Sequence, residues 1–553
     1  MSELLFAGLD VSTQSTKLVV IDAEKSEIVF TGTVNYDTDL PQYQTKNGVT
    51  KNLEEGASES EPIMWIDAVH NVFRKAARAR VEFGEIRCIA VSGQQHGLVS
   101  LDAEGNLTRP RSKLWNDFST LAECEILTER IGGLDAMIRE VGNSQRTGYT
   151  APKIFHMLRH EPEAYRNTST FFLVHNYINW FLTGGKNGGV RIMEPGDTSG
   201  MALWNPAAGQ WSAQVLQAID PQLAEKLPPV RPADRSIGKL SAALIRHYGF
   251  SGDCLIDAGS GDNMYSAVGT GNVLTGIVTV SLGTSGTAYT YMEKPFIDPA
   301  GEIAAFCDST GHFLPLLCVS NLANGYNALI EQFKISHEEF DAIIRTTEPG
   351  NGGRILIPWY MGERTPDVPL AAPTCFGFGL GDFSREILCR AVLEGHVLNL
   401  YEGFRSMPVE PKEVRLTGGL SKSEAWSQII ADIFEADAVP VEGEGAALGA
   451  ALHAAWVWMK ESGQERSIEE VVKPFVILDE KRRKKPIAAN VAKHHAQKRL
   501  FSALSRRLRG LPGADPFALR SQMAGPASQI RNSSAFASRH SPRFHFSGGS
   551  PRR

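Results

Sequence analysis

The chain has 553 residues, of which 42% are hydrophobic and 21% are charged, and its net charge is −6. This length is too great for one hydrophobic core, so we expect two domains with additional segments. The sequence contains no uncharged apolar run of the ~18 to 20 residues that a membrane span needs, and it opens with no basic and apolar leader, so we expect a cytoplasmic protein without a membrane partner.

The first half of the chain alternates between strand and helix patterns. Apolar side chains at helical spacing mark the helices, and short apolar runs mark the strands. In chain order we expect a strand meander, a polar loop, a helix, a buried strand and two further helices, over residues 1–35, 41–62, 63–81, 86–91, 121–131 and 151–158. This alternation indicates the α/β fold class.

The second half repeats this plan after a glycine-rich stretch. We place the domain boundary near residues 250–262, which gives an N-terminal domain over 1–255 and a C-terminal domain over 256–500. The expected elements are a pair of strands, a helix, a strand, a long helix, a strand and two helices, over residues 276–291, 320–333, 355–357, 384–406, 413–416, 423–434 and 446–458.

Basic residues concentrate at the C-terminal end. Residues 481–553 hold 17 Lys or Arg and one acidic residue, Asp515, whereas the other 480 residues hold 39 basic and 61 acidic groups. Residues 511–553 are rich in Ser, Pro, Gly and Arg with little periodicity, which predicts a disordered basic tail. A solvated extension is the simpler interpretation of this tail, and binding to nucleic acid is the less favoured alternative.

Two segments about 270 residues apart share one pattern, in which two β-rich runs flank a tight turn of Gly, Ser and Thr. Turns of this composition expose backbone N–H groups and hydroxyls, which suits them to bind phosphate. Two such turns on opposite halves of the chain suggest a nucleotide held between two domains. The turn residues are Ser12 and Thr13 in the first segment and Gly283 and Thr284 in the second.

Asp10 ends the first predicted strand, directly before the Ser12–Thr13 turn. A carboxylate in this place can hold Mg²⁺, usually through water, beside phosphate groups. Lys17, after the turn, adds positive charge. The alternative for Asp10 is a structural turn in a hairpin, and the second Gly/Thr turn favours the phosphate interpretation.

A second carboxylate, Asp262, lies in the Gly-rich stretch between the two halves. A carboxylate on a turn at a domain junction is well placed to accept the proton of a substrate hydroxyl, which is what phosphoryl transfer to an alcohol requires. The alternative is that Asp262 only forms the turn.

Two further loops follow predicted strands. Gly418 and Gly419 lie between a strand and a helix, where paired glycines let a flat ring or a phosphate approach the backbone. Gln95 and His96 follow the buried strand 86–91, and their side chains suit hydrogen bonding to a polyol. A structural role for His96 stays open as the alternative.

Two common nucleotide motifs are absent from the sequence. No G-x-x-x-x-G-K-[ST] occurs, and no G-x-G-x-x-G follows the first strand, which argues against a P-loop enzyme and a Rossmann dehydrogenase. The chain instead resembles the FGGY carbohydrate kinases over roughly residues 4–500. The resemblance rests on an ordered set of motifs: Gly8–Asp10 with Ser12–Thr13, then Gly93–Gly97, Trp115–Thr120, Gly148–Lys153, Gly261–Asn263, Gly283–Gly286, Gly362–Pro366 and Thr417–Gly419.

This resemblance implies two actin-like (ribonuclease H-like) domains around a central cleft, with sugar bound mainly by the first and ATP mainly by the second. It implies that Asp262 is the general base and that Asp10 positions Mg²⁺, with Thr13 near the phosphates. Gly283 and Thr284 would bind the terminal phosphates, and Gly418 and Gly419 would face the adenosine. The residues that would contact the sugar are Gln95, His96 and Asn263, with Asp117 and Arg146 (or its neighbour Gln145) as further candidates.

The identity of the sugar depends mostly on one loop. The Gln-Gln-His-Gly sequence over 94–97 is typical of the members that phosphorylate xylulose, so the resemblance implies D-xylulose. The segment Trp115–Thr120 departs mildly from the usual pattern, which keeps ribulose, gluconate and glycerol open as alternatives. A non-catalytic relative that binds sugar or nucleotide is a further alternative, and a homodimer is compatible with the sequence.

Overall fold

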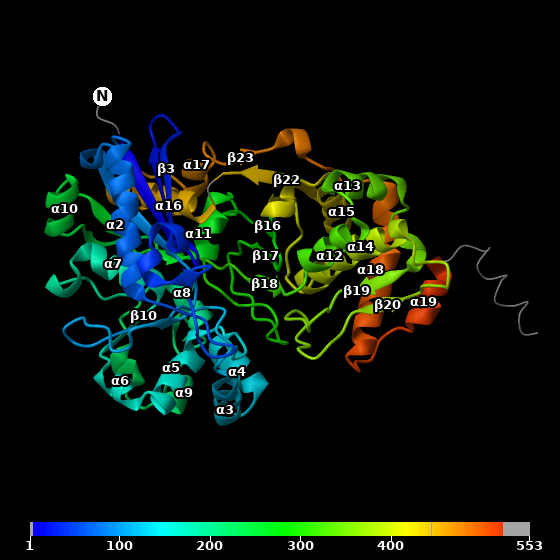
Figure 1. The fold of residues 1–553 in the computed structure, drawn as a ribbon, viewed down its shortest axis with the longest axis horizontal. Coiled ribbons are helices and arrows are strands. Elements are labelled where there is room, and N and C mark those ends of the chain that lie inside the picture. Colours follow the sequence, from blue (N-terminus) through cyan, green and yellow to red (C-terminus); the bar gives the residue numbers. More distant parts are fainter. Residues whose placement is uncertain (1–3, 444, 524–553) are drawn as a thin grey trace, which may run out of the picture.

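The computed structural model describes residues 4–443 and 445–523, which form two lobes joined by closely packed helices (Figure 1). Each lobe is built on one large sheet. The first sheet has the order β13-β14-β7-β1-β2-β3, with β15 paired to β7. Its strands are β1 (Leu5–Val11), β2 (Ser15–Asp22), β3 (Glu27–Asn35), β7 (Ile86–Gly93), β13 (Ser236–Lys239), β14 (Leu255–Asp257) and β15 (Ser260–Gly261).

The second sheet has the order β18-β17-β16-β21-β22-β23. Its strands are β16 (Ile277–Leu282), β17 (Gly286–Thr290), β18 (Leu316–Val319), β21 (Glu413–Thr417), β22 (Asp437–Glu442) and β23 (Ile477–Leu478). The shorter strands pair outside these sheets and are β4 (Thr45–Lys46), β5 (Val49–Thr50), β6 (Glu59–Ser60), β8 (Val99–Leu101), β9 (Ser112–Lys113), β10 (Thr170–Phe172), β11 (Trp204–Asn205), β12 (Gln210–Trp211), β19 (Ile355–Ile357) and β20 (Thr374–Phe376).

The two sheets share one connection pattern. In the first, β1 pairs antiparallel with β2 and β2 with β3, whereas β1 pairs parallel with β7 and β7 with β14. In the second, β16, β17 and β18 form the antiparallel part, and β16, β21 and β22 form the parallel part. This repetition confirms the expected α/β class and the pair of actin-like domains.

Helices cover both sheets. In the first half they are α1 (Tyr36–Asp39), α2 (Pro62–Arg78), α3 (Leu121–Ile131), α4 (Leu134–Val141), α5 (Thr150–His160), α6 (Pro162–Asn167), α7 (Val174–Thr183), α8 (Pro195–Thr198), α9 (Ala213–Ile219) and α10 (Ala242–Tyr248). The later ones are α11 (Asp262–Gly269), α12 (Ala323–Phe333), α13 (His337–Thr346), α14 (Arg385–Phe404), α15 (Glu424–Phe434), α16 (Gly445–Glu461), α17 (Ile468–Val472), α18 (Ala488–Leu508) and α19 (Pro516–Met523).

Helix α2 illustrates how the pattern of side chains forms these layers. Pro62 occupies its first turn, where the missing N–H costs nothing. Trp65, Val69, Val72 and Phe73 recur at helical spacing and are all buried, so one stripe of the helix packs against the first sheet at β2 and β3. The helix predicted over residues 63–81 is therefore confirmed within a few residues.

Helix α16 links the lobes. It follows β22 of the second sheet in the chain, yet it packs against α11 and against β1 and β7 of the first sheet. Small residues make this approach possible, because a Cβ at Gly449 would lie 1.8 Å from the backbone oxygen of Tyr265, and a Cβ at Gly8 would lie 2.0 Å from that of Ala447. The predicted boundary at 255/256 stays a prediction, and the path of α16 shows that the chain crosses between the lobes more than once.

A buried ion pair reinforces this junction. His453 of α16 places Nδ1 2.8 Å from Asp257 Oδ2 and Nε2 2.7 Å from the backbone oxygen of Ser309. Both partners are acceptors, so the ring donates from both nitrogens and carries a positive charge. Burial opposes that charge, but the Asp257 carboxylate outweighs it and raises the pKa of His453.

Most predicted elements are present, and a few were missed. The helix over 121–131 and the strand over 355–357 match α3 and β19. No element was predicted for α18, whose buried face includes Leu500, Phe501 and Leu504 beneath a highly basic surface. The expectation of disorder from 511 onward is wrong for α19, and residues 524–553 of the predicted tail lie outside the described residues.

Within residues 4–443 and 445–523, no helix combines the length and the apolar character that crossing a membrane requires.

Candidate active site

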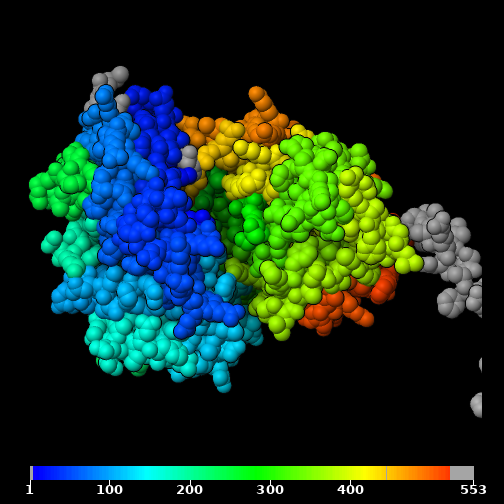
Figure 2. Space-filling view, viewed as in Figure 1, coloured from blue at the N-terminus to red at the C-terminus, as the bar shows by residue number. Residues whose placement is uncertain are grey.

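The predicted loops of the first lobe meet because three parallel strands end at the same edge of the sheet. Asp10 of β1 pairs with Ser92 of β7, and Ser92 pairs with Ser260 of β15. Asp262 follows two residues after Ser260 as the first residue of α11. This edge borders the hollow between the lobes, where green segments form the floor between the blue and yellow-green halves (Figure 2).

Asp10 lies among hydroxyl groups. Its Oδ2 accepts a hydrogen bond from Ser12 Oγ at 2.5 Å, and its Oδ1 accepts one from Ser92 Oγ at 2.8 Å. Lys17 is directly opposite on β2. Burial raises the pKa of Asp10, although the two hydroxyls and the Lys17 charge lower it in part. A nearby cation would therefore stabilise the ionised form of the Asp10 carboxylate.

The pKa of the Asp262 carboxyl group is strongly shifted. Burial, followed by the negative charges of Asp10 and Asp197, raises the pKa of Asp262 to about 8. Its side chain is partly exposed, so it remains reachable from the cleft. A carboxyl group with a pKa near neutrality, in reach of solvent, can accept a proton from a bound molecule.

A chain of amide groups connects Asp262 to the loop after β7. Asn263 Nδ2 donates to Asp262 Oδ1 at 3.1 Å and to Gln95 Oε1 at 2.7 Å. Gln95 Nε2 donates in turn to Asp197 Oδ1 at 3.4 Å. The structure thus brings Asn263 and Gln95 together beside Asp262, as expected. Asp197 was missed, because nothing in its local sequence indicates a partner that lies 102 residues away.

His96 lies next to these amides in an unusual backbone conformation. Its φ is +64°, which is uncommon for a residue other than glycine. Its ring packs 4.8 Å from the ring of Tyr149 and 6.0 Å from that of Phe306. Burial, then the charges of Lys153 and Arg364, hold the pKa of His96 well below its usual value. The imidazole is therefore neutral at pH 7.

A buried lysine fixes the backbone at His96. Lys153 of α5 is completely buried, and its Nζ donates to the backbone oxygen of His96 at 2.7 Å and to that of Gly148 at 2.8 Å. Burial lowers the pKa of Lys153 to about 7. The family motif over 148–153 includes this residue, but no local pattern indicates that it holds the neighbouring loop.

We expect Lys153→Met to raise the KM for the sugar about tenfold or more while changing kcat much less. The substitution removes the lysine donor from the Gly148 carbonyl and leaves the buried His96 carbonyl with only the 3.3 Å hydrogen bond from Thr150 Oγ1. A lost partner of this kind costs about 1–3 kcal/mol, and its loss frees the loop that carries His96. Steady-state kinetics of the purified variant measures both constants. Lys226→Met is the matched control, since it removes a lysine hydrogen bond to the backbone oxygen of Thr168 in the same lobe and should leave KM unchanged. An unchanged KM in Lys153→Met would contradict the expectation.

The second lobe offers a matching edge. Ser281 of β16 pairs with Thr417 of β21, so the Gly283–Thr284 turn and the Gly418–Gly419 turn lie at the same end of this sheet. Gly418 has φ +84°, and a Cβ there would lie 2.7 Å from the backbone oxygen of Leu282. A Cβ at Gly419 would meet nothing within 4 Å. This exposed, glycine-lined surface leaves room for a flat ring or a phosphate.

The two edges are connected through α11. Tyr289 of β17 packs with Met264 of α11, and the charge of Asp262 contributes to the raised pKa of Tyr289. The strand that follows the Gly283–Thr284 turn therefore runs beside the helix that carries Asp262. Asp262, whose pKa is also raised by Asp10, therefore lies between the strand before the first predicted phosphate turn and the strand after the second. In the first turn, Thr13 Oγ1 accepts a hydrogen bond from Trp115 Nε1 at 2.9 Å.

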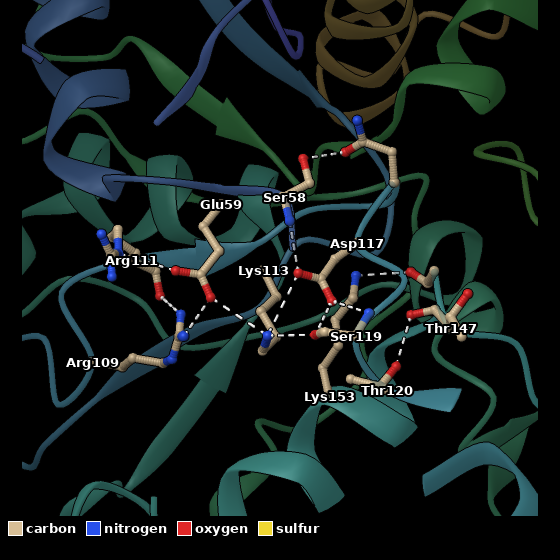
Figure 3. Close-up of polar contacts among 12 residues, drawn as sticks. Ser58, Glu59, Arg109, Arg111, Lys113, Asp117, Ser119, Thr120, Thr147 and Lys153 are labelled. Atoms are coloured by element: carbon tan, nitrogen blue, oxygen red, sulfur yellow. Dashed lines mark hydrogen bonds and ion pairs between the residues drawn. The ribbon is translucent and has the colours of Figure 1, made fainter. Parts of the chain in front are cut away.

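Asp117, predicted to contact the sugar, has another role in the structure. Its carboxylate is completely buried and accepts hydrogen bonds from Ser58 N at 2.9 Å and from Ser119 Oγ at 2.5 Å (Figure 3). Lys113 Nζ lies 3.5 Å from Asp117 Oδ2 and 3.4 Å from Glu59 Oε1. Asp117 therefore holds the segment Trp115–Thr120 against its neighbours, and its predicted contact with sugar stays a prediction.

Arg146 connects the two halves of the chain by a hydrogen bond. Its Nη2 donates to the backbone oxygen of Gly301 at 2.9 Å, and its Nε donates to Ser144 Oγ at 3.2 Å. The alternative candidate, Gln145, is buried and donates to the backbone oxygen of Ala202 at 3.1 Å. The predicted contact of either residue with sugar remains a prediction.

Comparisons with known proteins agree with this geometry. The model of the FGGY family of carbohydrate kinases matches with its N-terminal domain over residues 5–269 and with its C-terminal domain over residues 278–458. A xylulose kinase of Haemophilus influenzae is 33% identical over 516 residues, covering 91% of this chain and 100% of that protein. A xylulose kinase of Streptomyces coelicolor is 31% identical, covering 82% and 87%.

A solved structure is similar as well. The xylulose kinase from Bifidobacterium adolescentis superimposes with a TM-score of 0.74 at 27% identity, covering 89% of this chain and 99% of that one.

Proposed function

Because this chain belongs to the FGGY family of carbohydrate kinases, and is therefore an ATP-dependent sugar kinase, we propose that it transfers the γ-phosphoryl group of ATP to the terminal hydroxyl of D-xylulose. The observation that carries the reaction is the position of Asp262: a carboxyl group with a raised pKa at the start of α11, between Asp10 and the amides of Asn263 and Gln95. The choice of xylulose is supported by the names of the relatives and by the Gln94–Gly97 loop.

In the proposed reaction, the sugar hydroxyl oxygen attacks the γ-phosphorus in line with the bond to the leaving oxygen. The O–H proton passes to Asp262, the new P–O bond forms, and the bond between the γ-phosphorus and the β,γ-bridging oxygen breaks to release ADP. A positioned base contributes typically about 10²–10⁴-fold to such a reaction, and most of the remaining acceleration comes from positioning and charge stabilisation.

The other residues have binding roles in this proposal. Gln95, His96 and Asn263 hydrogen-bond the sugar, and the neutral ring of His96 can do so as donor or acceptor. Ser12, Thr13, Lys17, Gly283 and Thr284 hold the phosphates, while Gly418 and Gly419 face the adenosine. We further propose that residues 1–255 and 256–500 act as the sugar-binding and the ATP-binding domain.

The residues around Asp10 fit Mg²⁺. A carboxylate with adjacent hydroxyls offers the hard oxygen ligands that this ion prefers, and a cation there relieves the repulsion between Asp10 and Asp262. A Mg²⁺ bound there would neutralise negative charge on the phosphates of the substrate.

The raised pKa of Asp262 predicts the pH dependence of turnover. The base works only in its ionised form, so kcat/KM for the sugar should rise about tenfold per pH unit well below pH 8 and level off above it. When kcat/KM for the sugar is measured at a low ATP concentration, its pH dependence reports the ionisation of groups in the free enzyme. A kcat/KM that is constant between pH 6 and pH 9 would remove Asp262 from the role of base.

The identity of the substrate is tested by a coupled assay of ADP release with a panel of sugars at equal concentration. We expect the highest kcat/KM with D-xylulose, compared with ribulose, gluconate and glycerol. A preference for one of the others would overturn the choice of sugar and leave the kinase assignment intact, whereas binding of sugar without turnover of any would favour the non-catalytic alternative.

A further inference from the structure

Three side chains that commonly ligate metals meet on the sugar-side lobe, away from the residues of the cleft. His156 and His160 are four residues apart on α5 and so lie on one face of that helix. Glu123 reaches them from the first turn of α3. One ligand atom from each of the three residues lies within 4.8 Å of the other two.

The spacing of these atoms is close to that of a metal site. Ligands of a tetrahedral Zn²⁺ lie about 2.0–2.2 Å from the ion and hence about 3.4 Å from one another. Glu123 Oε1 and His160 Nε2 are 3.2 Å apart, which already meets this requirement. The rings of His156 and His160 have centroids 4.5 Å apart, so the third ligand lies beside the other two.

A second observation at this place is an unsatisfied ring nitrogen. The Nδ1 atom of His156 is buried and makes no hydrogen bond with any described residue. A buried polar atom without a partner costs free energy unless a ligand or water satisfies it. When the proton of the neutral ring is on Nε2, the lone pair of His156 Nδ1 is free to bind a metal ion.

The carboxylate is held as metal-ligating carboxylates usually are. Glu123 is almost completely buried, and its Oε1 accepts a hydrogen bond from Arg159 Nη1 at 2.5 Å. Outer partners of this kind orient a ligand, and the second lone pair of Oε1, on the oxygen that lies near His160, is left for the ion. The positive charge of Arg159 lowers the affinity, so we expect a moderate dissociation constant rather than a very tight one.

From this geometry we propose that Glu123, His156 and His160 form a binding site for one divalent transition-metal ion, with Zn²⁺ as the preferred occupant and water as the fourth ligand. Two imidazoles on one helical face with a carboxylate suit Zn²⁺, whereas Mg²⁺ prefers oxygen ligands only. The ion would cross-link α3 to α5. The start of α5 carries Lys153, and α3 follows the Asp117 network, so the cross-link would stabilise the framework behind the sugar loop (Figure 3).

Calorimetric titration of chelator-treated, full-length protein with ZnCl₂ tests this proposal. We expect one binding event per chain that is absent with MgCl₂, together with a higher temperature of thermal unfolding. His160→Ala is the main variant, because its side chain is half exposed and its loss should not disturb the fold. Its affinity for Zn²⁺ should fall at least tenfold, and His156→Ala and Glu123→Gln should behave alike.

His247→Ala is the matched control, since this histidine lies on α10 in the same lobe and belongs to no cluster of metal-ligating residues in the described part of the chain. It should keep the affinity and the thermal shift of the parent. Equal affinity in His160→Ala and His247→Ala, or no binding to the parent protein, would overturn the proposal. Kinase turnover with Mg²⁺ serves as a separate readout, because it tests the proposed reaction and not this site.

Discussion

Asp262→Asn should lower kcat by about 10²–10⁴ while leaving sugar binding nearly unchanged. The amide has the same size and can keep the hydrogen bond with Asn263, but it cannot accept a proton from the sugar hydroxyl. Turnover measured by ADP release, and sugar affinity measured by calorimetry, separate the two effects.

Asp253→Asn is the matched control for this variant. Asp253 lies nine residues earlier, on the surface, where it pairs with Lys239. Exposed ion pairs contribute little, so turnover should stay near that of the parent. If Asp262→Asn kept near-normal kcat, or if the control lost as much activity, the role of Asp262 as general base would be wrong.

Gly449→Ala should destabilise the protein by about 3 kcal/mol or more and should also reduce turnover. The new Cβ would lie 1.8 Å from the backbone oxygen of Tyr265, a contact that no side-chain rotation can relieve, so α11 and α16 must move apart. Because α11 begins with Asp262, this movement displaces the proposed base, and a displacement of about 1 Å can cost 10²-fold in rate.

The midpoint of thermal unfolding and kcat, measured on the same preparation, check this expectation. Gly252→Ala is the matched control, because a Cβ there meets nothing within 4 Å and its backbone conformation is open to alanine. We expect the control to be unchanged in both measurements. A Gly449→Ala protein with the stability of the parent would show that the two helices do not need their close contact.

Much of the site could be predicted because its residues lie at the ends of strands. A strand that stops at Asp10, another that stops before Gln95 and a glycine turn before Asp262 are all readable from local composition, and parallel strands bring such ends together. In the second lobe the two predicted turns also follow strands that pair in parallel, and Gly418 needs its positive φ there.

The structural roles of two buried residues had no local signal. Asp117 has the composition of a binding-loop residue, but the approach of Ser58 and Lys113 from distant segments encloses it completely. Lys153 ends the family motif over 148–153, and only its contact with the backbone of His96 shows why it is buried. The predicted tail contained α19, whose eight residues are too few to show a clear period.

The sequence alone determined the class of fold, the order of the strands and helices, and the type of chemistry, because these depend on patterns within a few neighbouring residues. Only the tertiary structure decided which candidates face the cleft, how α16 returns to the first sheet, and that Glu123 meets His156 and His160. Those outcomes depend on which distant segments pack together, and packing is set by the sum of many weak contacts that no single stretch of sequence records.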